Sequence, residues 1–321
     1  MRALLLALLC CPECRGRLAA QPASLACDAE IMDGELSCSG CSAVFRVRAG
    51  VPQLLSGEKQ ATRTQLSFGK QWKLHNRGSF ERGSIYSKTR MECLDDFRKA
   101  FSLPDLSGLR DCVILDAGCG SGELTADLGR AAPHATIVGL DFSEAAQIAF
   151  AQCRGIPNVH IVQADLARPP FLPRIFDFVW SEGVIHHTPD TERSFASLSG
   201  LVKSRGKLYV WLYSSARTTP FRLARKLLRR SYLLPSAALY ALSWSLALPV
   251  HVLNKAREAL RLSSVRHRLS STAYSFYDTL SPEFVHFHSH DEVHAWFRRQ
   301  NFEGVVFVPG SPDIGACGTK K

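Results

Sequence analysis

The sequence lacks internal repeats and low-complexity tracts, and it is poor in the residues that mark unstructured or fibrous chains. Only 22 glycines and 16 prolines occur among 321 residues, which excludes a collagen-like composition. Hydrophobic residues make up 46% and charged residues 21%, a balance that excludes an intrinsically disordered chain. The length allows two domains, or one large domain with additions, and a substantial buried core.

The N-terminus lacks a long apolar run. Its apolar segment extends only from Ala3 to Leu9, and Leu9 is not the small residue that leader cleavage before Cys10 requires. The 11 cysteines are odd in number and scattered, which favours a reduced protein over a disulfide scaffold. The sequence therefore predicts a cytoplasmic location.

Four cysteines form two pairs with the spacing of metal ligands. The four are Cys11, Cys14, Cys38 and Cys41. Two such turns present four thiolates as a tetrahedron, the geometry that structural zinc prefers, and the metal would supply folding energy to a small module. Cys10 and Cys27 are spare thiols, either of which could replace one ligand. A closed four-thiolate site has no open position, so we expect a structural rather than a catalytic role.

This cysteine-rich stretch, which continues through Phe45 to Val51 and Pro52, resembles the zinc-ribbon family of methyltransferase-activator subunits, the Trm112-like type. All four paired cysteines match the pattern of that family, whose members accompany or are fused to methyltransferases. The resemblance implies a zinc ribbon over residues 1–57 with bound structural Zn²⁺.

Between residues 111 and 213, apolar strand patterns alternate with helical patterns. Apolar strands separated by helices imply a parallel sheet covered on both faces, an α/β doubly wound, Rossmann-like architecture. The clearest helix is expected at 144–153 with Ser143 as its cap, and a second helix after Ser289. The expected strands are 112–116, 135–141, 159–165, 176–180, 207–212, 304–308 and 314–318.

A loop with three glycines, residues 118–122, follows the first of these strands. Glycines let a backbone approach a ligand closely, and the next helix offers free amide donors. Asp116 precedes the loop, and Asp141 ends the next strand, where it could accept both ribose hydroxyls. Asp165 ends the third strand, where it could meet an adenine amino group. The glycines alone would also suit a dinucleotide.

Four segments of this region look like the successive motifs of class I S-adenosylmethionine (SAM) methyltransferases, of the methyltransferase type 11-like group. The segments are residues 115–122, 139–143, 163–165 and 176–179. By the precedent of that family, Asp116 and the glycine loop hold the methionine end of SAM. Asp141 would hold the ribose, and Asp165 with Leu166 the adenine. The cofactor-binding residues that the resemblance implies are Asp116, Gly118, Cys119, Gly120, Gly122, Asp141, Phe142, Asp165, Leu166 and Ser181.

Phe68 and Trp72 lie upstream, in a segment that resembles one that folds over bound SAM in a subset of these enzymes. A plain packing role for Trp72 is the alternative interpretation. The resemblance covers about residues 67–212 and resumes after an insert.

Methyl transfer from a sulfonium is an in-line displacement, so the protein mainly positions and desolvates the acceptor. A base is needed only where the acceptor enters protonated, and His186 or His187 after the fourth strand could serve. The same pair also fits a structural role in which one ring holds the loop. Glu182 is a third candidate, facing the sulfonium.

A second histidine cluster comprises His286, His288 and His290. Alternating histidines suggest metal binding, but no carboxylate is spaced as an obvious further ligand. We favour lining of the acceptor pocket over metal binding.

Residues 214–280 form a basic helical insert. Residues 217–270 hold eleven Lys or Arg and one acid, Glu258, a net charge of +10 that equals the charge of the whole chain. Residues 231–254 carry no charge and could span a membrane by length, but Pro235 and Pro249 make this a poor span. Apolar and basic residues alternate at helical spacing over 221–229. The insert could be a lid over the acceptor pocket, a membrane-surface anchor or a contact for an anionic polymer, and we favour the lid.

We therefore predict a SAM-dependent methyltransferase that acts on oxygen, nitrogen or carbon of a small-molecule or lipid-linked metabolite, with peripheral membrane contact through residues 217–270 as an added expectation. One alternative is an RNA methyltransferase, although the sequence lacks an aromatic-interleaved basic sheet and the Asn/Asp-Pro-Pro-aromatic sequence of base-amino methylases. Another is a non-catalytic partner protein, which would have no use for intact glycine and acidic motifs. The expected parts are a ribbon (1–57), a linker with SAM-capping helices (58–110), the SAM-binding core (111–213), the lid (214–280) and the closing helix and strands (281–321).

Overall fold

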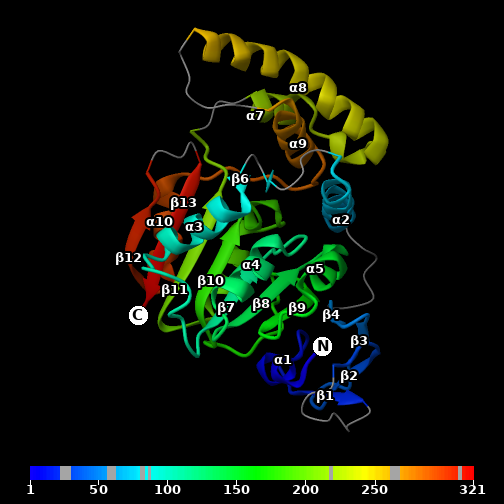
Figure 1. Ribbon diagram of the computed structural model, residues 1–321, viewed down its shortest axis with the longest axis vertical. Helices are drawn as coiled ribbons and strands as arrows, with labels where there is room; N and C mark the ends of the chain where they lie inside the picture. The colour runs from blue at the N-terminus through cyan, green and yellow to red at the C-terminus, as the bar shows by residue number, and fades with distance from the viewer. Residues whose placement is uncertain are drawn as a thin grey trace.

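The computed structural model describes residues 1–21, 30–55, 63–79, 84–85, 88–216, 220–260, 268–309 and 313–321. Three parts follow one another along the long axis of the molecule. The α/β core lies in the middle, the cysteine-rich N-terminal segment at one end and the insert helices at the other (Figure 1). Cys27, one of the two spare thiols, lies outside the described residues.

One 11-stranded sheet runs through the core and the N-terminal segment in the order β1-β2-β3-β4-β9-β8-β7-β10-β11-β13-β12. Its five central strands, from β9 to β11, pair in parallel, whereas β13 pairs antiparallel with β11 and β12. The strands are β1 (Leu18–Gln21), β2 (Gly34–Cys38), β3 (Val44–Arg48), β4 (Val51–Leu54), β7 (Val113–Ala117), β8 (Thr136–Asp141), β9 (Val159–Ala164), β10 (Phe176–Glu182), β11 (Val202–Leu212), β12 (Phe302–Phe307) and β13 (Ile314–Lys320). A separate two-stranded sheet consists of β5 (Ser84–Ile85) and β6 (Lys88–Thr89).

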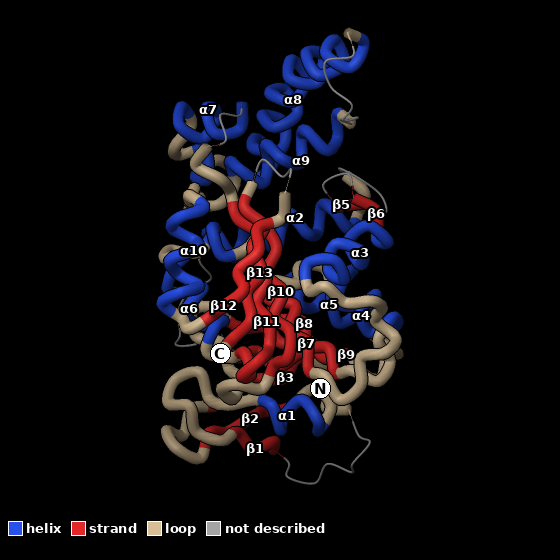
Figure 2. Tube along the Cα trace, turned by 90° about the vertical axis from the view of Figure 1, so that its left-hand side faces the viewer, coloured by secondary structure: helices blue, strands red, loops and turns tan. Residues whose placement is uncertain are grey.

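Helices cover both faces of the sheet, as apolar parallel strands require (Figure 2). α3, α4 and α5 lie on one face, and α6 and α10 on the other. This confirms the predicted doubly wound fold. The helices are α1 (Ala3–Leu8), α2 (Arg63–Asn76), α3 (Arg90–Ala100), α4 (Glu123–Ala131), α5 (Ala145–Cys153), α6 (Thr191–Ser199), α7 (Pro220–Leu227), α8 (Ser236–Ala259), α9 (Leu269–Leu280) and α10 (His290–Arg299), with 3₁₀ turns η1 (Ile185–His187) and η2 (Ser231–Leu233).

Several expected element ends need correction. β11 begins five residues before the expected start, because its first part is half exposed and carries polar side chains that hide a strand pattern. The cap of α5 is Glu144 rather than Ser143, although the Ser143 hydroxyl still accepts the Ala145 amide at 3.1 Å. The cap expected at Ser289 is confirmed, with a full capping box on Glu292.

The N-terminal segment is joined firmly to the core. β4 pairs in parallel with β9, so the sheet continues across the expected boundary at residue 57. The Arg15 guanidinium donates to the carbonyls of Pro169 at 2.7 Å and Phe171 at 2.5 Å. The strands of the N-terminal segment therefore extend the core sheet.

The insert has a small apolar core of its own. Buried side chains of α7, α8 and α9, such as Ala224, Leu239, Ala273 and Tyr277, pack together. Leu74 of α2 packs against this cluster, so the insert rests on the helix that precedes the core. The three helices lie beyond the end of the sheet where β7, β8 and β10 terminate (Figure 1).

Candidate functional site

A cavity of about 1150 Å³ opens at the carboxyl ends of the central strands. The strand order reverses between β7 and β10, and open α/β sheets bind ligands at such a reversal. The walls come from the ends of β7, β8 and β10, from helices α2 and α3, from the insert helices, and from residues of β6, β11, β12 and β13. This volume slightly exceeds the range of about 300–1,000 Å³ that is usual for small-molecule sites, so two ligands can lie in the cavity together.

The glycine loop leaves β7 in conformations that favour glycine. Gly118, Gly120 and Gly122 have φ of +94°, +53° and +80°, and Gly122 is the left-handed N-cap of α4. A Cβ on Gly118 would lie 2.3 Å from a Val184 methyl, and one on Gly120 2.3 Å from the Trp72 ring. Gly118 and Cys119 line the cavity. The loop is therefore packed tightly between α2 and the segment after β10.

Asp116 and Asp141 both line the cavity, at the ends of neighbouring strands. Burial raises the pKa of Asp116 to about 7, against a 2.6 Å hydrogen bond from the Thr125 hydroxyl. Burial also raises the pKa of Asp141, although it accepts the Ser143 hydroxyl and the amides of Ser143 and Gly120 at 2.7–2.9 Å. Oδ1 already accepts two bonds from Ser143, whereas Oδ2 accepts the Gly120 amide and keeps lone-pair capacity for a ribose hydroxyl.

The other expected SAM residues divide into two groups. Phe142 and Leu166 line the cavity. Asp165 follows β9, but it is not among the cavity-lining residues, and its carboxylate accepts the Ala167 amide at 2.8 Å. Ser181 is fully buried and donates to the Ala117 carbonyl at 3.1 Å, so it fastens β10 to β7 rather than facing the cavity.

Helix α2 covers the glycine loop. Phe68 and Trp72 lie one turn apart on α2 and both line the cavity. The Gln65 amide donates to the Phe142 carbonyl at 2.8 Å, which fixes α2 over the end of β8. Both interpretations of Trp72 therefore agree with the packing, because the ring lies on the loop and also lines the cavity.

Glu182 lies at the end of β10 and lines the cavity. It pairs with Lys88 of β6 at 3.0 Å, and Lys88 also pairs with Asp96 at 2.7 Å. The carboxylate therefore already has a cationic partner and faces the β5–β6 side of the cavity.

His186 and His187 lie behind the cavity wall and are not among its lining residues. His186 is fully buried, and burial holds its pKa well below the usual value, so the ring is neutral. His187 places Nδ1 3.1 Å from the Phe284 carbonyl and Nε2 3.7 Å from the carboxylate of Asp278. Neither ring lines the space that an acceptor would occupy.

Asp278, on α9 of the insert, is a site residue that the sequence reasoning missed. It is buried, lines the cavity and accepts hydrogen bonds from Gln71 at 2.9 Å and from the Tyr213 hydroxyl at 2.6 Å. Burial would raise the pKa of Asp278, but the neighbouring His187 and the hydrogen bonds from Gln71 and Tyr213 outweigh burial and keep this pKa below the usual value. The sequence signal that could have identified Asp278 is that a single acidic residue interrupts the otherwise uncharged sequence of α9.

The second histidine cluster contributes only through its neighbour Phe287, which lines the cavity. His286 Nε2 lies 3.1 Å from the Thr188 carbonyl, and His288 Nδ1 lies 3.1 Å from Glu292. Among the described residues, the cysteine group is the one cluster with metal-binding geometry, and no histidine belongs to it.

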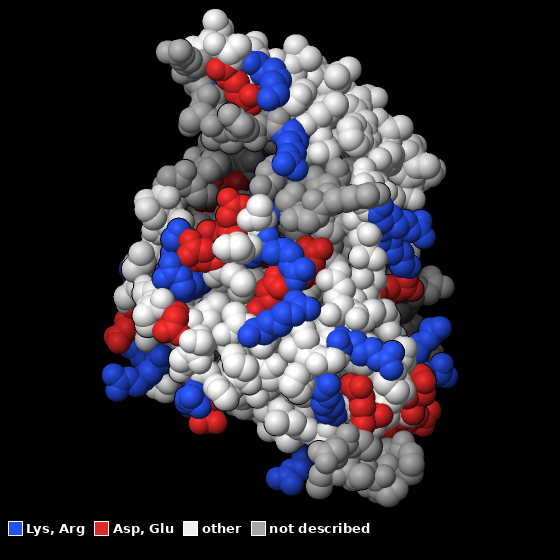
Figure 3. All heavy atoms as spheres, in the orientation of Figure 1, with Lys and Arg blue, Asp and Glu red and all other residues white. Residues whose placement is uncertain are grey.

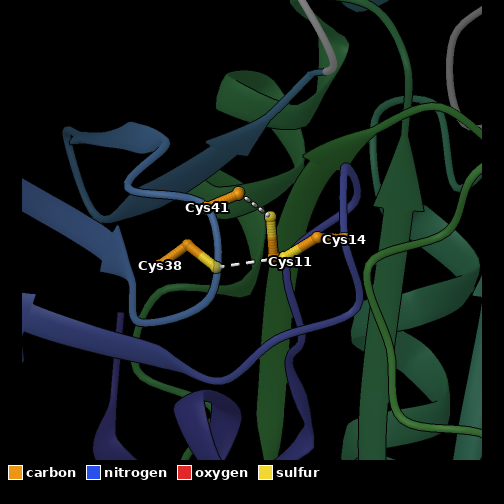
Figure 4. Close-up of side chains that lie close together, drawn as sticks. All are labelled: Cys11, Cys14, Cys38 and Cys41. Atoms are coloured by element: carbon orange, nitrogen blue, oxygen red, sulfur yellow. Dashed lines mark hydrogen bonds between the residues drawn. The ribbon is translucent and has the colours of Figure 1, made fainter.

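The four paired cysteines converge at the N-terminal end of the molecule (Figure 4). Their sulfurs lie within 4.8 Å of one another, with 3.4 Å between Cys14 and Cys38 and 3.7 Å between Cys11 and Cys41. A zinc–sulfur bond of about 2.3 Å gives sulfurs about 3.8 Å apart in a tetrahedron, so the donor set fits structural zinc. Cys10 lies outside this group and its amide donates to the Pro170 carbonyl at 2.9 Å.

Two regions of the chain match known families. Residues 115–210 match the model of a methyltransferase domain (Methyltransf_11), and residues 2–50 match that of Trm112p-like protein. A solved structure of the CurJ carbon methyltransferase aligns with a TM-score of 0.50 at 13% identity, covering 80% of this chain and 61% of that one. That likeness shows the fold.

Curated relatives match mainly the core. Trans-aconitate 2-methyltransferase of Deinococcus radiodurans is 37% identical over 97 residues, which are 30% of this chain and 36% of that protein. The tRNA U34 carboxymethyltransferase of Shewanella woodyi is 30% identical over 161 residues, 49% of this chain and 46% of that protein. The chain thus spans less than half the length of either relative. It carries a methyltransferase domain with a SAM-binding fold and a Trm112p-like domain whose cysteines fit zinc, as its motifs predict.

Proposed function

We propose that this protein is an enzyme that transfers the methyl group of SAM to a small-molecule or lipid-linked metabolite, at oxygen, nitrogen or carbon. The observation that carries the proposal is one cavity that joins Asp116, Asp141 and the glycine loop to polar side chains of the insert. The first group fits SAM and the second fits an acceptor, so one cavity can hold both reactants close together.

In the proposed arrangement, Asp116 and the loop at Gly118 hold the methionine end of SAM, and Asp141 holds the ribose. Phe142, Leu166 and the rings of Phe68 and Trp72 would enclose the adenosine and the sulfonium. Asp165 would reach the adenine only after its turn rearranges, because its carboxylate now caps that turn.

SAM supplies an electrophilic methyl group and a sulfonium leaving group that becomes neutral on transfer. The protein therefore has to orient the acceptor, exclude water and, for a protonated acceptor, take up a proton. Of the earlier candidates, Glu182 is the one that lines the cavity. His187 is better suited to hold Asp278 in place than to contact an acceptor.

RNA methylation is the second candidate function. It is favoured by the likeness to the tRNA U34 carboxymethyltransferase and by the basic insert. The acidic residues in the cavity wall, Asp278 among them, favour a small acceptor over a polyanion. A non-catalytic role is disfavoured by the cavity, which a scaffold protein does not need.

We further propose a cytoplasmic location with peripheral membrane contact through residues 217–270. Helix α8 is apolar and long enough to cross a membrane, with 17% of its most apolar window buried. Length and composition alone are weak support for a span, and Pro249 lies inside the helix. Contact along the membrane surface agrees better with a helix that also lines the cavity, through Val250 and Asn254.

Calorimetric titration tests the core of the proposal. SAM, or its demethylated product, should bind with a Kd on the order of micromolar, about −8 kcal/mol. Asp141→Ala should weaken this binding by about 3 kcal/mol or more, because two ribose hydroxyls lose a charged acceptor. Unchanged binding in that variant would contradict the cofactor assignment.

A further inference from the structure

The insert contributes a distinct part of the cavity wall, which we call the lid half. It is formed by Gln71 of α2, by Tyr213 at the end of β11, and by residues of the insert and the segment after it. Its insert and downstream residues are Phe221, Val250, Asn254, Ser271, Thr272, Ser275, Asp278, Thr279 and Phe287. Aromatic rings and hydroxyl groups dominate this wall, and Asp278 is the charged residue in this set. A second carboxylate, that of Asp313, also lines the cavity and accepts the amide of Ser214, the residue after Tyr213, at 3.2 Å.

Two hydrogen-bond acceptors in this wall have capacity for a ligand. Asp278 accepts one bond at Oδ1, from Gln71, and its carboxylate offers about four lone-pair sites in all. The Oε1 atom of Gln71 is buried and receives no donor from the described residues, while the side chain is only 1% exposed. A buried acceptor without a donor is costly, so this wall favours a ligand that brings N–H or O–H groups.

None of the described residues that line this wall is a cation. The cations among the described cavity-lining residues lie elsewhere, on β6, α3 and β11, and each has a partner. Lys88 pairs with Asp96 and Glu182, Lys99 pairs with Asp95, and Lys207 donates to the Phe101 carbonyl. A carboxylate or phosphate in the lid half would therefore lie beside Asp278. Arg222 stacks on the Phe287 ring at 5.1 Å from its centroid, but it is not among the lining residues and already donates to the Ser215 carbonyl.

The lid half adjoins the glycine loop. Gln71 and Trp72 are neighbours on α2; the first contacts Asp278 and the second packs on Gly120. From the opposite side, Val184 packs on Gly118, and the 3₁₀ turn that follows places His187 beside Asp278. Asp278 and the expected methionine end of SAM are thus held by the same two elements.

We propose that the lid half is the acceptor subsite and that it takes an amine or a hydroxyl compound without negative charge, with Asp278 as the proton acceptor. This rests on the proposed methyl transfer. The nitrogen or oxygen lone pair of the acceptor forms the new bond to the methyl carbon. The C–S bond breaks with its electron pair left on sulfur, and the proton of the acceptor N–H or O–H passes to the Asp278 carboxylate and then to water. His187 and Tyr213 are positioning residues that orient this carboxylate.

Matched probes can test the charge preference without knowledge of the natural acceptor. Benzylamine, benzyl alcohol and benzoate share a ring for the aromatic wall and differ in the charge of the polar group. We expect benzylamine to bind the protein saturated with S-adenosylhomocysteine about tenfold or more tightly than benzoate, as measured by ligand-observed NMR. Benzyl alcohol should lie between them.

Variants locate the effect. Asp278→Asn should remove the preference for benzylamine, and Gln71→Met, which keeps the side-chain length, should weaken both donor probes. Asp111→Asn makes the same charge change at an exposed position outside the cavity and should alter nothing. Circular dichroism melts identify a variant that fails to fold, and the second substitution then carries the test.

Three results would overturn the subsite: benzoate binding as tightly as benzylamine, insensitivity of the probes to both substitutions, or no probe binding at all. Methyl transfer to a panel of amines, phenols and carboxylic acids adds a second readout. Turnover confined to carboxylic acids would overturn the subsite while sustaining the methyltransferase. Failure of SAM itself to bind would instead remove the proposed function.

Discussion

At the scale of single residues, the buried carboxylate of Asp116 links SAM binding to pH. Burial raises its pKa to about 7, and the negative charges of Asp141 and Glu182 add to this rise. Near neutral pH, a large fraction of free protein therefore carries a protonated Asp116. The α-ammonium of SAM needs the ionised carboxylate, so binding must release a proton below this pKa.

SAM affinity should consequently fall by about tenfold per pH unit below about pH 7 and level off above it. Calorimetry in buffers of different ionisation enthalpy should detect the released proton. Asp116→Asn should bind more weakly and lose the pH dependence. An affinity that stays constant from about pH 6 to about pH 8 would contradict this role of Asp116.

Gly120 provides a second test at this scale. Its φ is +53°, and a Cβ there would lie 2.3 Å from the Trp72 ring. Gly120→Ala should displace α2, lower the melting temperature and weaken SAM binding by about tenfold or more. Gly155→Ala is the matched control, because Gly155 has φ of +89° with no atom within 4 Å of the new Cβ. The control should lose about 1 kcal/mol of stability and keep SAM affinity. Equal effects of the two substitutions would show that strain alone, and not contact with Trp72, is responsible.

A site residue can be predicted from the sequence only where the residues next to it in the chain indicate its place in the fold. Asp116 and Asp141 end apolar strands next to a glycine loop, so sequence places them at one sheet edge. Asp278 could not be placed, because its partners Gln71 and Tyr213 lie 207 and 65 residues away in the chain.

At the scale of elements, the ribbon is the part whose stability depends on a ligand. Its four cysteines gather sulfurs within 4.8 Å, and a closed thiolate site should hold about one zinc per chain, as measured by elemental analysis. Replacing Cys11 and Cys38 with Ser should lower the melting temperature and leave SAM affinity nearly intact, because the cluster lies at the opposite end of the sheet from the insert. Loss of activity without loss of stability would indicate a functional ribbon.

Element prediction succeeded where buried apolar runs are bounded by turns, as in β7, β8 and β9. It failed for β4, which has only four residues and whose partner β9 lies about a hundred residues further along. Pairing of that kind leaves no local pattern, so the sequence shows a ribbon ending near residue 57 and not one sheet shared with the core.

At the scale of the whole molecule, the net positive charge of the chain and several exposed apolar side chains belong to the insert. The surface over α8 is largely uncharged apart from a cluster near one end (Figure 3). Leu248, Val252 and Leu253 of α8 are 55–60% exposed, and Leu227 of α7 is 73% exposed. Exposed cations lie near the ends of α7 and α8; they include Lys226, Arg229, Arg230, Lys255 and Arg257. An apolar helix face bordered by cations is typical of proteins that lie on an anionic membrane surface.

The protein should therefore bind vesicles that contain anionic phospholipid and bind neutral vesicles poorly. Binding should weaken as salt rises, because the Debye length is about 8 Å at physiological ionic strength. A variant with Gln at positions 226, 229 and 230, in place of Lys226, Arg229 and Arg230, should bind these vesicles more weakly. The expected loss of binding free energy is about 3 kcal/mol, at about 1 kcal/mol per cation. Arg225 is left unchanged in this variant because it donates to the Glu283 carbonyl at 2.6 Å.

The matched control replaces Arg17, Arg46 and Arg48, three exposed cations of the ribbon at the opposite end of the molecule, with Gln. It makes the same change in net charge, so sedimentation with vesicles should be unaffected if the insert is the membrane contact.

Leu248→Ser with Val252→Ser should reduce vesicle binding at every salt concentration, because insertion of apolar side chains is not screened by ions. A protein that acts as a lid alone would bind no vesicle, and its exposed Arg229 would instead become protected from trypsin when SAM and acceptor fill the cavity. Equal losses in the insert and ribbon variants would show that net charge, and not this face, attracts the membrane. Displacement from vesicles by RNA at equal phosphate concentration, with recovery of a methylated nucleotide, would favour the RNA alternative.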